Sequence, residues 1–431
     1  MDLPAPARSV EEHRAALLAD LAPLAPVATP PADAVGRRLA EPVVAAVALP
    51  RFDHAAMDGF AVHASDLAPP AAADAGLPVS GTIGAGVPGP GALERGTAIR
   101  IMTGAPVPPG ADAVVPFEWT TSVHGRVLVG RPVAAGANIR RAGEDVAAGD
   151  EVAAAGAVLA PRTVGLLAAT GVGDVLVRPA PRVVVLTTGT ELVPAGTPAD
   201  RLAAGAVHDS TAVALVAELR ALGAQARAVG PVGDEPEDFL VALDQAVRDA
   251  DLVVTTGGIS AGDRDVVKAA LSGRDGFWFG PVAVRPGRPQ GAGSLVVESG
   301  GSRRVPVVAL PGTPAATYLA FQCFVRPVLA LLAGADPVRA GVDVPVEVAA
   351  PVRRSPDRTL LLPGTYDAEG RALVLPGHAG HSQRLLARAD LVLVVPPGSE
   401  DLPAGARIGA IVPAGAGDAA GIRRAAPARG Q

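Results

Sequence analysis

The sequence predicts a multidomain protein of the α/β plus β class with a central parallel α/β sheet. Three observations predict it. Strand-like apolar runs alternate with helical segments between residues 180 and 335. Short apolar pieces separated by Gly and Pro fill residues 50–145 and 341–413, which is typical of small β domains. The length of 431 residues also exceeds what one ordinary core accommodates.

The N-terminal segments favour helix. Ser9-Val10-Glu11-Glu12 is a capping box that opens a helix through about Leu21. Residues 34–49 are a second helix-like stretch that ends at Pro50, and a short helix is expected from Thr163 to Gly171. We predict a helical and extended linking domain at 1–49 and 146–179, with a loop-rich β domain inserted at 50–145.

The sheet domain is predicted at 180–335. Apolar strands are expected at 182–189, 252–254 and 305–310. The helices between and after them are expected at 211–222, capped by Asp209-Ser210, at 237–250, and around Tyr318 to Leu329. Ligands of such sheets bind beyond the carboxyl ends of the strands, so the segments after Leu186, Val254 and Leu310 are candidates.

The C-terminal region returns to short strands, as in VDVPVEVAAPV, RALVLPG and DLVLVVPPG. We predict a separate β domain, barrel-like, at 341–413 and a disordered Ala/Gly/Arg-rich tail at 414–431.

Composition excludes several classes of function. The net charge of −6 and the lack of a Lys/Arg cluster make nucleic acid a poor partner. Cys323 is the only cysteine, so neither an intramolecular disulfide nor a Cys-based zinc site can form. No signal pattern and no uninterrupted bilayer-length apolar stretch are visible, so we expect a cytoplasmic protein without a membrane partner.

The most informative segment is DLVVTTGGISAGDRD, from Asp251 to Asp265. A strand ends in two glycines that let backbone N–H groups approach an anion. Asp263 and Asp265 follow, and carboxylates there can hold Mg²⁺ against phosphate oxygens. The alternative is a strand–turn–helix connection whose aspartates cap the helix.

Other segments carry weaker signals. Glu191, in TTGTE, follows a strand end and suits a metal or hydroxyl ligand, and LPGTP at Leu310 could turn backbone N–H groups toward a ligand. The arginines of RPGRP could hold an oxyanion, although a surface turn is the alternative. Asp58-Gly59 is by itself an ordinary turn, and Gly143-Glu144-Asp145 a solvated one. His378 and His381 lack a third ligand nearby and are expected to be solvated.

Taken in order, these segments resemble the MoeA/gephyrin E-domain family of molybdopterin molybdenumtransferases. The matching segments are MDGFAV at Met57, RIMTGAPVPPGADAVV at Arg100, GEDV at Gly143, TTGTEL at Thr187, TTGGISAGDRD at Thr255, RPGRP at Arg285 and LPGTP at Leu310. The resemblance implies a cytosolic homodimer of four-domain protomers, with a molybdopterin-binding fold in the sheet domain and an active site shared between subunits.

The implied activity is Mg²⁺-dependent insertion of molybdate into adenylylated molybdopterin with release of AMP. The implied partner is the molybdopterin adenylyltransferase that makes this substrate. Residues at matching positions are expected to act as follows. The catalytic candidates are Asp58, Glu191, Asp209, Asp263 and Asp265. The metal candidates are Asp145, Glu191, Asp263 and Asp265. The substrate-binding candidates are Thr103, Gly104, Gly257, Gly258, Ser260, Arg285, Gly287, Arg288, Pro311, Pro314 and Arg358.

The chain departs from the family pattern around the oxyanion-binding positions. The departures are Ala55, Thr190, Thr211, Pro281, Thr313, Gly380, and arginines in place of lysines at 285 and 288. Two rival functions follow: a non-catalytic pterin-binding or scaffold protein, and a hydrolase like the nicotinamide-nucleotide deamidases. The latter lack the RIMTGAP loop and the C-terminal β domain.

Overall fold

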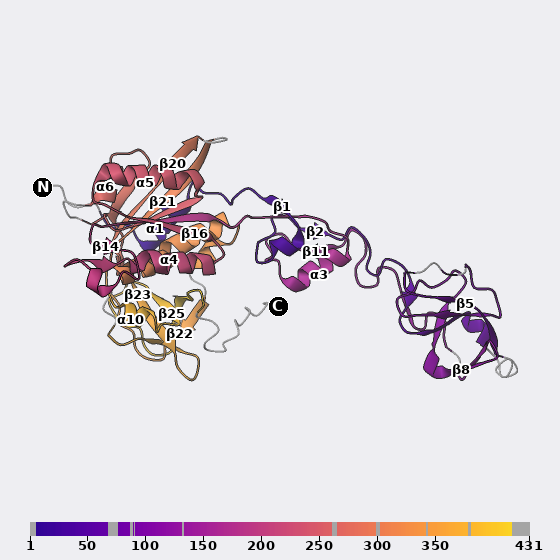
Figure 1. The fold of residues 1–431 in the computed structure, drawn as a ribbon. Helices are drawn as coiled ribbons and strands as arrows, with labels where there is room; N and C mark the ends of the chain where they lie inside the picture. Colours follow the sequence, from indigo (N-terminus) through magenta and orange to yellow (C-terminus); the bar gives the residue numbers. More distant parts are fainter. Residues whose placement is uncertain are drawn as a thin grey trace. The chain divides into compact units, whose positions relative to one another are not determined.

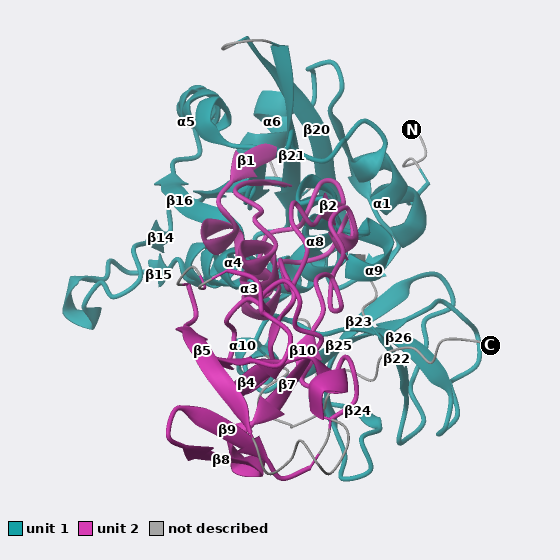
Figure 2. Cartoon of the chain, turned by 90° about the vertical axis from the view of Figure 1, so that its right-hand side faces the viewer, with its two compact units in different colours: residues 1–26, 178–431 teal, residues 27–177 magenta. Residues whose placement is uncertain are grey.

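The computed structural model describes residues 6–67, 76–86, 89, 91–131, 133–260, 265–298, 302–341, 344–377 and 381–415 (Figure 1). The chain divides into two compact units, residues 1–26 with 178–431 and residues 27–177 (Figure 2). The predicted fold class is confirmed, because a doubly covered α/β sheet and separate β sheets are both present. The four-domain division with its boundaries stays a prediction.

The first unit is built on a six-stranded sheet of order β16-β13-β17-β21-β20-β18. The strands are β13 (Arg182–Thr188), β16 (Gln225–Val232), β17 (Leu252–Thr256), β18 (Trp278–Pro281), β20 (Pro289–Glu298) and β21 (Ser302–Leu310). The four strands from β16 to β21 are parallel, as predicted. β20 and β18 extend the sheet in antiparallel fashion, which the sequence did not indicate.

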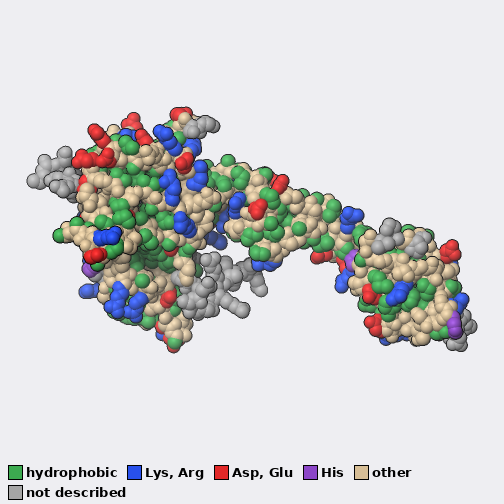
Figure 3. Space-filling model, viewed as in Figure 1, with side chains coloured by type: hydrophobic (Ala, Val, Ile, Leu, Met, Phe, Trp, Pro, Cys, Tyr) green, Lys and Arg blue, Asp and Glu red, His purple; other side chains and the backbone are tan. Residues whose placement is uncertain are grey.

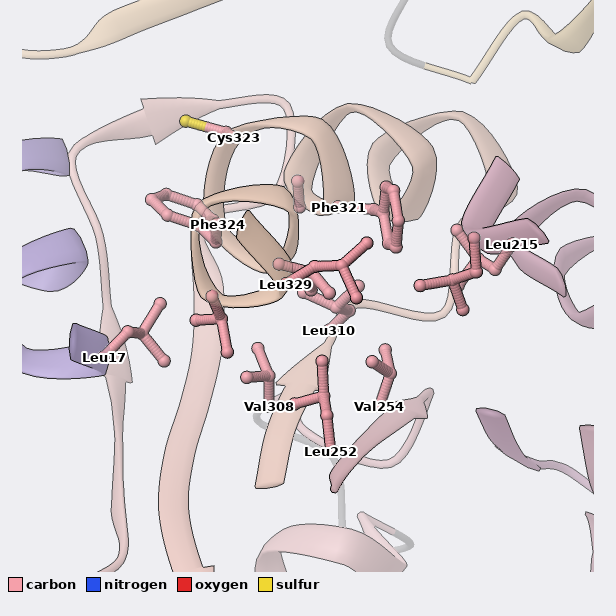
Figure 4. Packing of buried hydrophobic residues seen from close by; sticks show 14 of the residues in the cluster. Leu17, Leu215, Leu252, Val254, Val308, Leu310, Phe321, Cys323, Phe324 and Leu329 are labelled. Atoms are coloured by element: carbon pink, nitrogen blue, oxygen red, sulfur yellow. The ribbon is translucent and has the colours of Figure 1, made fainter. Parts of the chain in front are cut away.

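Helices cover both faces of this sheet. α1 (Val10–Leu18), α4 (Ser210–Ala221) and the helix Pro314–Leu332 pack on one face, while α5 (Pro236–Asp249) and α6 (Val266–Leu271) pack on the other. Figure 4 shows Leu252 and Val254 of β17 and Val308 and Leu310 of β21 pointing toward the long helix. Such strands are apolar on both faces because both faces are buried.

The long helix consists of α7 (Pro314–Ala320), a π-helical turn at Phe321–Val325 and α8 (Arg326–Leu332). Among the described residues it is the one helix long and apolar enough to cross a membrane, and 83% of its apolar window is buried inside the structure. Burial against the sheet accounts for its composition, as expected of a core helix.

A second sheet in this unit has the order β19-β23-β25-β26-β22, with β24 paired to β23. The predicted C-terminal strands are confirmed as β22 (Val344–Glu347), β24 (Ala372–Val374) and β25 (Leu391–Val395). The strands not predicted are β19 (Val284–Arg285), β23 (Thr359–Tyr366) and β26 (Arg407–Ile411). Smaller elements are β14 (Leu192–Val193), β15 (Val207–His208), η4 (Ala199–Arg201), α9 (Pro337–Gly341) and α10 (Gln383–Leu386). Residues 416–431 of the predicted tail lie outside the described residues.

The second unit holds a six-stranded sheet of order β7-β4-β6-β5-β9-β8 and three two-stranded sheets. The six strands are β4 (Gly59–Val62), β5 (Leu77–Ile83), β6 (Ala98–Ile101), β7 (Ala113–Pro116), β8 (Thr120–Val123) and β9 (Arg126–Val129). The pairs are β1 (Val27–Thr29) with β12 (Val175–Val177), β2 (Val43–Val44) with β11 (Glu151–Ala153), and β3 (His54–Ala55) with β10 (Ile139–Arg140). Its helices are η1 (Pro31–Ala34), η2 (Ala64–Leu67), η3 (Phe117–Trp119) and α3 (Pro161–Ala169).

One element prediction was wrong. Residues 34–49 do not form a helix; they contain strand β2 and isolated bridges at Arg38, Leu39 and Leu49. Gly36 has a φ of +81°, Pro42 removes a backbone donor, and the run Val43-Val44 pairs with β11 instead. Helix propensity differs between residues by only tenths of a kcal/mol, so these pairings override it.

The buried histidine of α1 makes stability depend on pH. His13 is fully buried, its ring centroid lies 4.9 Å from that of Phe324, and neither ring nitrogen has a hydrogen-bond partner among the described residues. Burial, followed by the positive charge of Arg8, lowers the pKa of His13 to about 3. An unfolded histidine takes up a proton near pH 6.5, whereas the folded one stays neutral down to about pH 3.

We therefore expect the free energy of unfolding to fall by up to about 1.4 kcal/mol per pH unit as the pH drops below about 6.5. Above that pH, His13 is neutral in both states, and this loss of stability does not occur. His13→Leu should remove this part of the slope in urea unfolding curves measured between pH 7 and 4. His381→Gln is the control, because His381 is an exposed histidine elsewhere in the same unit. Identical slopes for His13→Leu and the unsubstituted chain would contradict the assignment.

Candidate functional site

The carboxyl ends of β13, β17 and β21 meet at one edge of the first unit's sheet. Gly257 follows β17 with φ +87°, and its N–H donates to the carbonyl of Leu310 at 3.1 Å. A Cβ at position 257 would lie 2.9 Å from Thr188 Oγ1, and one at Gly312 would lie 3.2 Å from the Gly257 Cα. The three glycine-containing segments that were predicted to bind a ligand are thus packed together. Position 257 requires glycine because its φ is positive and because a Cβ there would be too close to Thr188.

Other predicted residues flank this edge. Gly258 and the exposed Ser260 continue from Gly257, while Pro311 is buried and Pro314 is the first residue of α7. Asp263 lies outside the described residues, as do His378 and Gly380. Asp265 occupies the N-cap position of α6, yet its side chain makes no capping hydrogen bond there.

Glu191 is an exposed carboxylate at the end of β13. Its side chain folds back over Gly189, where a Cβ would lie 2.5 Å from Glu191 Oε2. The carbonyl of Glu191 accepts from Val207 N–H at 2.8 Å, which fixes the backbone beneath the carboxylate. The carboxylate is therefore presented at the same edge as Gly257.

Asp209 is held by structural contacts. It is 6% exposed, its Oδ2 accepts from Thr187 Oγ1 at 2.7 Å, and its Oδ1 accepts from Ala212 N–H at 2.9 Å. The predicted capping role is confirmed, since Asp209 is the N-cap of α4. Both carboxylate oxygens are thus engaged, and a catalytic role stays a prediction.

Arg285 and Arg288 lie in the turn 285–289 between β18 and β20. Both are exposed, and neither guanidinium has an ion-pair or hydrogen-bond partner among the described residues. β19 pairs with β23, so Val284 lies opposite Thr359, and Arg358 directly precedes that partner. The pairing brings three predicted arginines to one region. In Figure 3, Lys and Arg side chains gather over the elements around α10.

Arg358 differs from the other two arginines. Its guanidinium donates to both carboxylate oxygens of the neighbouring Asp357. This bidentate hydrogen bonding, together with a hydrogen bond from Ser355 Oγ, holds the pKa of Asp357 well below its usual range. A ligand of Arg358 would therefore compete with an existing ion pair.

The second unit brings Asp58 and Thr103 together. Asp58 Oδ1 accepts from the N–H and from Oγ1 of Thr103, both at 2.7 Å. These hydrogen bonds, the backbone one first, hold the pKa of the Asp58 carboxyl below its usual range. The segments MDGFAV and RIMTGAP are thus in contact, and Gly104, with φ +78°, turns the chain after Thr103.

Asp145 lines a depression of about 660 Å³ in the same unit. Its walls include His54, Arg140 and Glu144, whose carboxylate accepts from Arg140 Nη1 at 3.2 Å. His54 and Arg140 were not predicted, because nothing in the local sequence distinguishes them. They reach the depression through the pairing of β3 with β10.

Two further residues were missed in the first unit. Asp234 follows β16, next to β13 in the sheet, and its Oδ2 accepts from Thr190 Oγ1 at 2.9 Å. The sequence signal was present, since Asp234 follows a strand end as Glu191 does. Gln290, beside RPGRP, is 1% exposed and had no signal in the sequence.

The predicted metal ligands do not form a cluster within the described residues. No group of three or more His, Cys, Asp or Glu side chains there could hold a metal ion, although Asp263 falls outside that part of the chain.

Comparison with known proteins assigns the family. Residues 8–171 match the MoeA N-terminal region (domain I and II), and residues 184–331 match a probable molybdopterin binding domain. Molybdopterin molybdenumtransferase 2 of Mycobacterium tuberculosis is 37% identical over 93% of this chain and 98% of its own length. The chain belongs to the MoeA family.

Further relatives agree with this membership. Molybdopterin molybdenumtransferase of Synechococcus elongatus is 34% identical over 90% of this chain and 95% of its own. The crystal structure of the molybdopterin biosynthesis MoeA protein from Pyrococcus horikoshii aligns with a TM-score of 0.77 at 26% identity, covering 94% of this chain and 99% of that one. The predicted resemblance and the fold of this MoeA-family chain are confirmed.

Proposed function

We propose that this chain inserts molybdate into adenylylated molybdopterin and releases AMP, the reaction that its place among molybdopterin molybdenumtransferases implies. The observation that carries the proposal is the meeting of the β13, β17 and β21 ends beside the turn with Arg285 and Arg288. A glycine-built turn and two guanidinium groups that have no partner within the described part of the chain suit a substrate with phosphates and an oxyanion.

The glycine edge binds the pterin phosphate in this proposal. The backbone after β17 turns at Gly257 and Gly258 and carries the exposed Ser260 hydroxyl. Pro311 and Pro314 shape the neighbouring segment before α7. Successive N–H groups at such a turn neutralise phosphate charge without a side chain.

The arginines bind molybdate. Arg285 and Arg288 offer planar forks of N–H donors that match tetrahedral oxyanions. Arg358 contributes after its ion pair with Asp357 opens. Arginine in place of lysine keeps the charge while it presents more donors in a fixed geometry.

The donor set at this edge is compatible with Mg²⁺. Glu191, Asp234 and Asp265 offer only hard oxygen atoms, and they follow adjacent strands of the sheet. Mg²⁺ is commonly held by one or two carboxylates together with phosphate oxygens and water, so a three-residue cluster is not required. We assign Glu191, Asp263 and Asp265 to hold it. Bound Mg²⁺ would neutralise phosphate charge and lower the pKa of a water.

The second unit, taken by itself, carries groups that suit proton transfer and anion binding. The hydrogen bonds from Thr103 keep Asp58 ionised and leave its Oδ2 available to accept a proton or orient water. Arg140, with its guanidinium at the depression beside Asp145, is suited to a phosphate or carboxylate of the substrate. We further propose a homodimer as the functional form and the molybdopterin adenylyltransferase as the supplier of substrate.

The purified chain with adenylylated molybdopterin, molybdate and Mg²⁺ tests the proposal. We expect AMP, measured by chromatography, together with cofactor that activates an apo-molybdoenzyme. Both products should be lost when the divalent ion is chelated. Binding of molybdopterin without AMP release would overturn the proposal in favour of the non-catalytic scaffold.

A further inference from the structure

The turn that carries Arg285 and Arg288 is anchored by its backbone at two places. At its base, Val282 N–H donates to the carbonyl of Arg288 at 2.8 Å. On its outer side, Thr359 N–H donates to the carbonyl of Ala283 at 2.9 Å, and β19 pairs with β23 through Arg285. The Arg285 side of the turn is therefore tied to the C-terminal sheet.

A single side chain holds the middle of the turn. Gln290 Nε2 donates to the carbonyl of Gly287 at 2.7 Å. Gly287 has φ +94°, a conformation that residues with a Cβ rarely adopt. The hydrogen bond therefore fixes a special backbone conformation one residue before Arg288.

Gln290 is a polar residue at a buried position. It is 1% exposed, and its Oε1 has no hydrogen-bond partner among the described residues. An unpaired buried acceptor is costly, and an apolar side chain of the same length would avoid that cost. An apolar residue, however, could not donate the hydrogen bond that Gln290 Nε2 gives to the carbonyl of Gly287.

We propose that Gln290 is a positioning residue that sets the Arg288 guanidinium relative to that of Arg285 for binding of a tetrahedral oxyanion. The inference rests on the proposed function, in which these arginines bind molybdate. The backbone of Arg285 is held by the pairing of β19 with β23. Gln290 acts on the other arginine, through the carbonyl of Gly287.

Gln290→Met in the full-length chain tests the inference, with molybdate alone and tungstate alone as calorimetric probes. Met keeps the volume and length, removes the donor, and also removes the unpaired Oε1. Its midpoint of unfolding should therefore stay near that of the unsubstituted chain, while oxyanion affinity falls roughly tenfold. In turnover, the KM for molybdate should rise by the same factor with kcat little changed.

Two variants that each lack one arginine show through which arginine Gln290 acts on oxyanion binding. In Arg288→Ala, adding Gln290→Met should weaken oxyanion binding no further, because the arginine that Gln290 positions is already gone. In Arg285→Ala, the same addition should still weaken binding severalfold. Thr255→Val is the matched control: it removes another buried unpaired oxygen from the same sheet and should leave oxyanion affinity unchanged.

The outcomes separate this inference from the proposed function. If the unsubstituted chain binds neither oxyanion, the proposal that Arg285 and Arg288 bind molybdate is wrong. The inference about Gln290, which rests on that proposal, is then wrong as well. If the unsubstituted chain binds and Gln290→Met binds equally well, the proposed function stands and the inference is overturned. Should Gln290→Met unfold, Gln290→Leu repeats the comparison with a shorter apolar side chain, and unchanged affinity there overturns the inference in the same way.

Discussion

Replacing Glu191 by Gln should lower the rate of AMP release by at least about a hundredfold. The substitution keeps the size and shape of the side chain and removes its negative charge. Glu191 is exposed at the carboxyl end of β13, and its backbone is fixed by the hydrogen bond from Val207. A neutral amide is a weaker ligand than a carboxylate for a hard cation such as Mg²⁺.

The fold should tolerate this change. Because the Glu191 carboxylate lies at the surface, the midpoint of unfolding of Glu191→Gln should stay within about a degree of the unsubstituted chain. Glu298→Gln is the matched control, since Glu298 is an exposed carboxylate at the opposite edge of the same sheet. Equal rates of AMP release for the Glu191 and Glu298 variants would remove Glu191 from the catalytic set.

Replacing Glu218 by Ala should destabilise the chain by roughly 3 kcal/mol or more. Glu218 on α4 is 5% exposed and accepts three hydrogen bonds. Tyr318 Oη donates to Oε2 at 2.9 Å, while Gln322 Nε2 and Ala414 N–H donate to Oε1 at 2.7 and 2.9 Å. Truncation leaves all three donors without their acceptor, and each orphaned donor that stays buried costs about 1–3 kcal/mol.

The carboxylate of Glu218 also joins separate parts of the first unit. Ala414 follows β26, and Arg326 Nη1 donates to the carbonyl of Val412 at 2.8 Å. Loss of Glu218 should therefore expose the end of the C-terminal sheet first, which hydrogen exchange at residues 407–415 would report.

Urea unfolding of a small set of variants checks the size of this effect. Tyr318→Phe removes one of the three donors and should cost about 1 kcal/mol. Glu218→Gln keeps an acceptor for Gln322 and Ala414 and should fall between Tyr318→Phe and Glu218→Ala. A free energy of unfolding for Glu218→Ala within about 1 kcal/mol of the unsubstituted chain would contradict the role of this carboxylate.

Much of the fold could be predicted from local patterns. The capping box at Ser9, the N-cap at Asp209 and the helix ends at Leu18 and Ala221 depend on neighbours within one or two turns. Strands β13, β17 and β21 each contain an apolar run because they are covered on both faces, and that pattern is visible in the sequence. The ends of those strands then predicted where Gly257, Glu191 and Pro311 would lie.

The tertiary structure alone decided other features. The pairing of residues 34–49 depends on partners far along the chain, such as Val158 for Arg38 and Val177 for Leu39, so local propensity gave the wrong element. β19 pairs with β23 of the C-terminal sheet, and this pairing brings Arg358 into the same region as Arg285. No local pattern reports a hydrogen bond across such distances in sequence.

The sequence by itself determined the fold class, the order of the segments that carry chemistry, and the strand ends where those segments lie. It did so because periodicity, caps and turns act between near neighbours. Only the tertiary structure decided which polar side chains find partners. Asp209 accepts from Thr187, Glu218 gathers three donors, and Gln290 holds Gly287. Satisfying a buried polar group depends on packing in space, and residues far apart in the chain supply many of the partners.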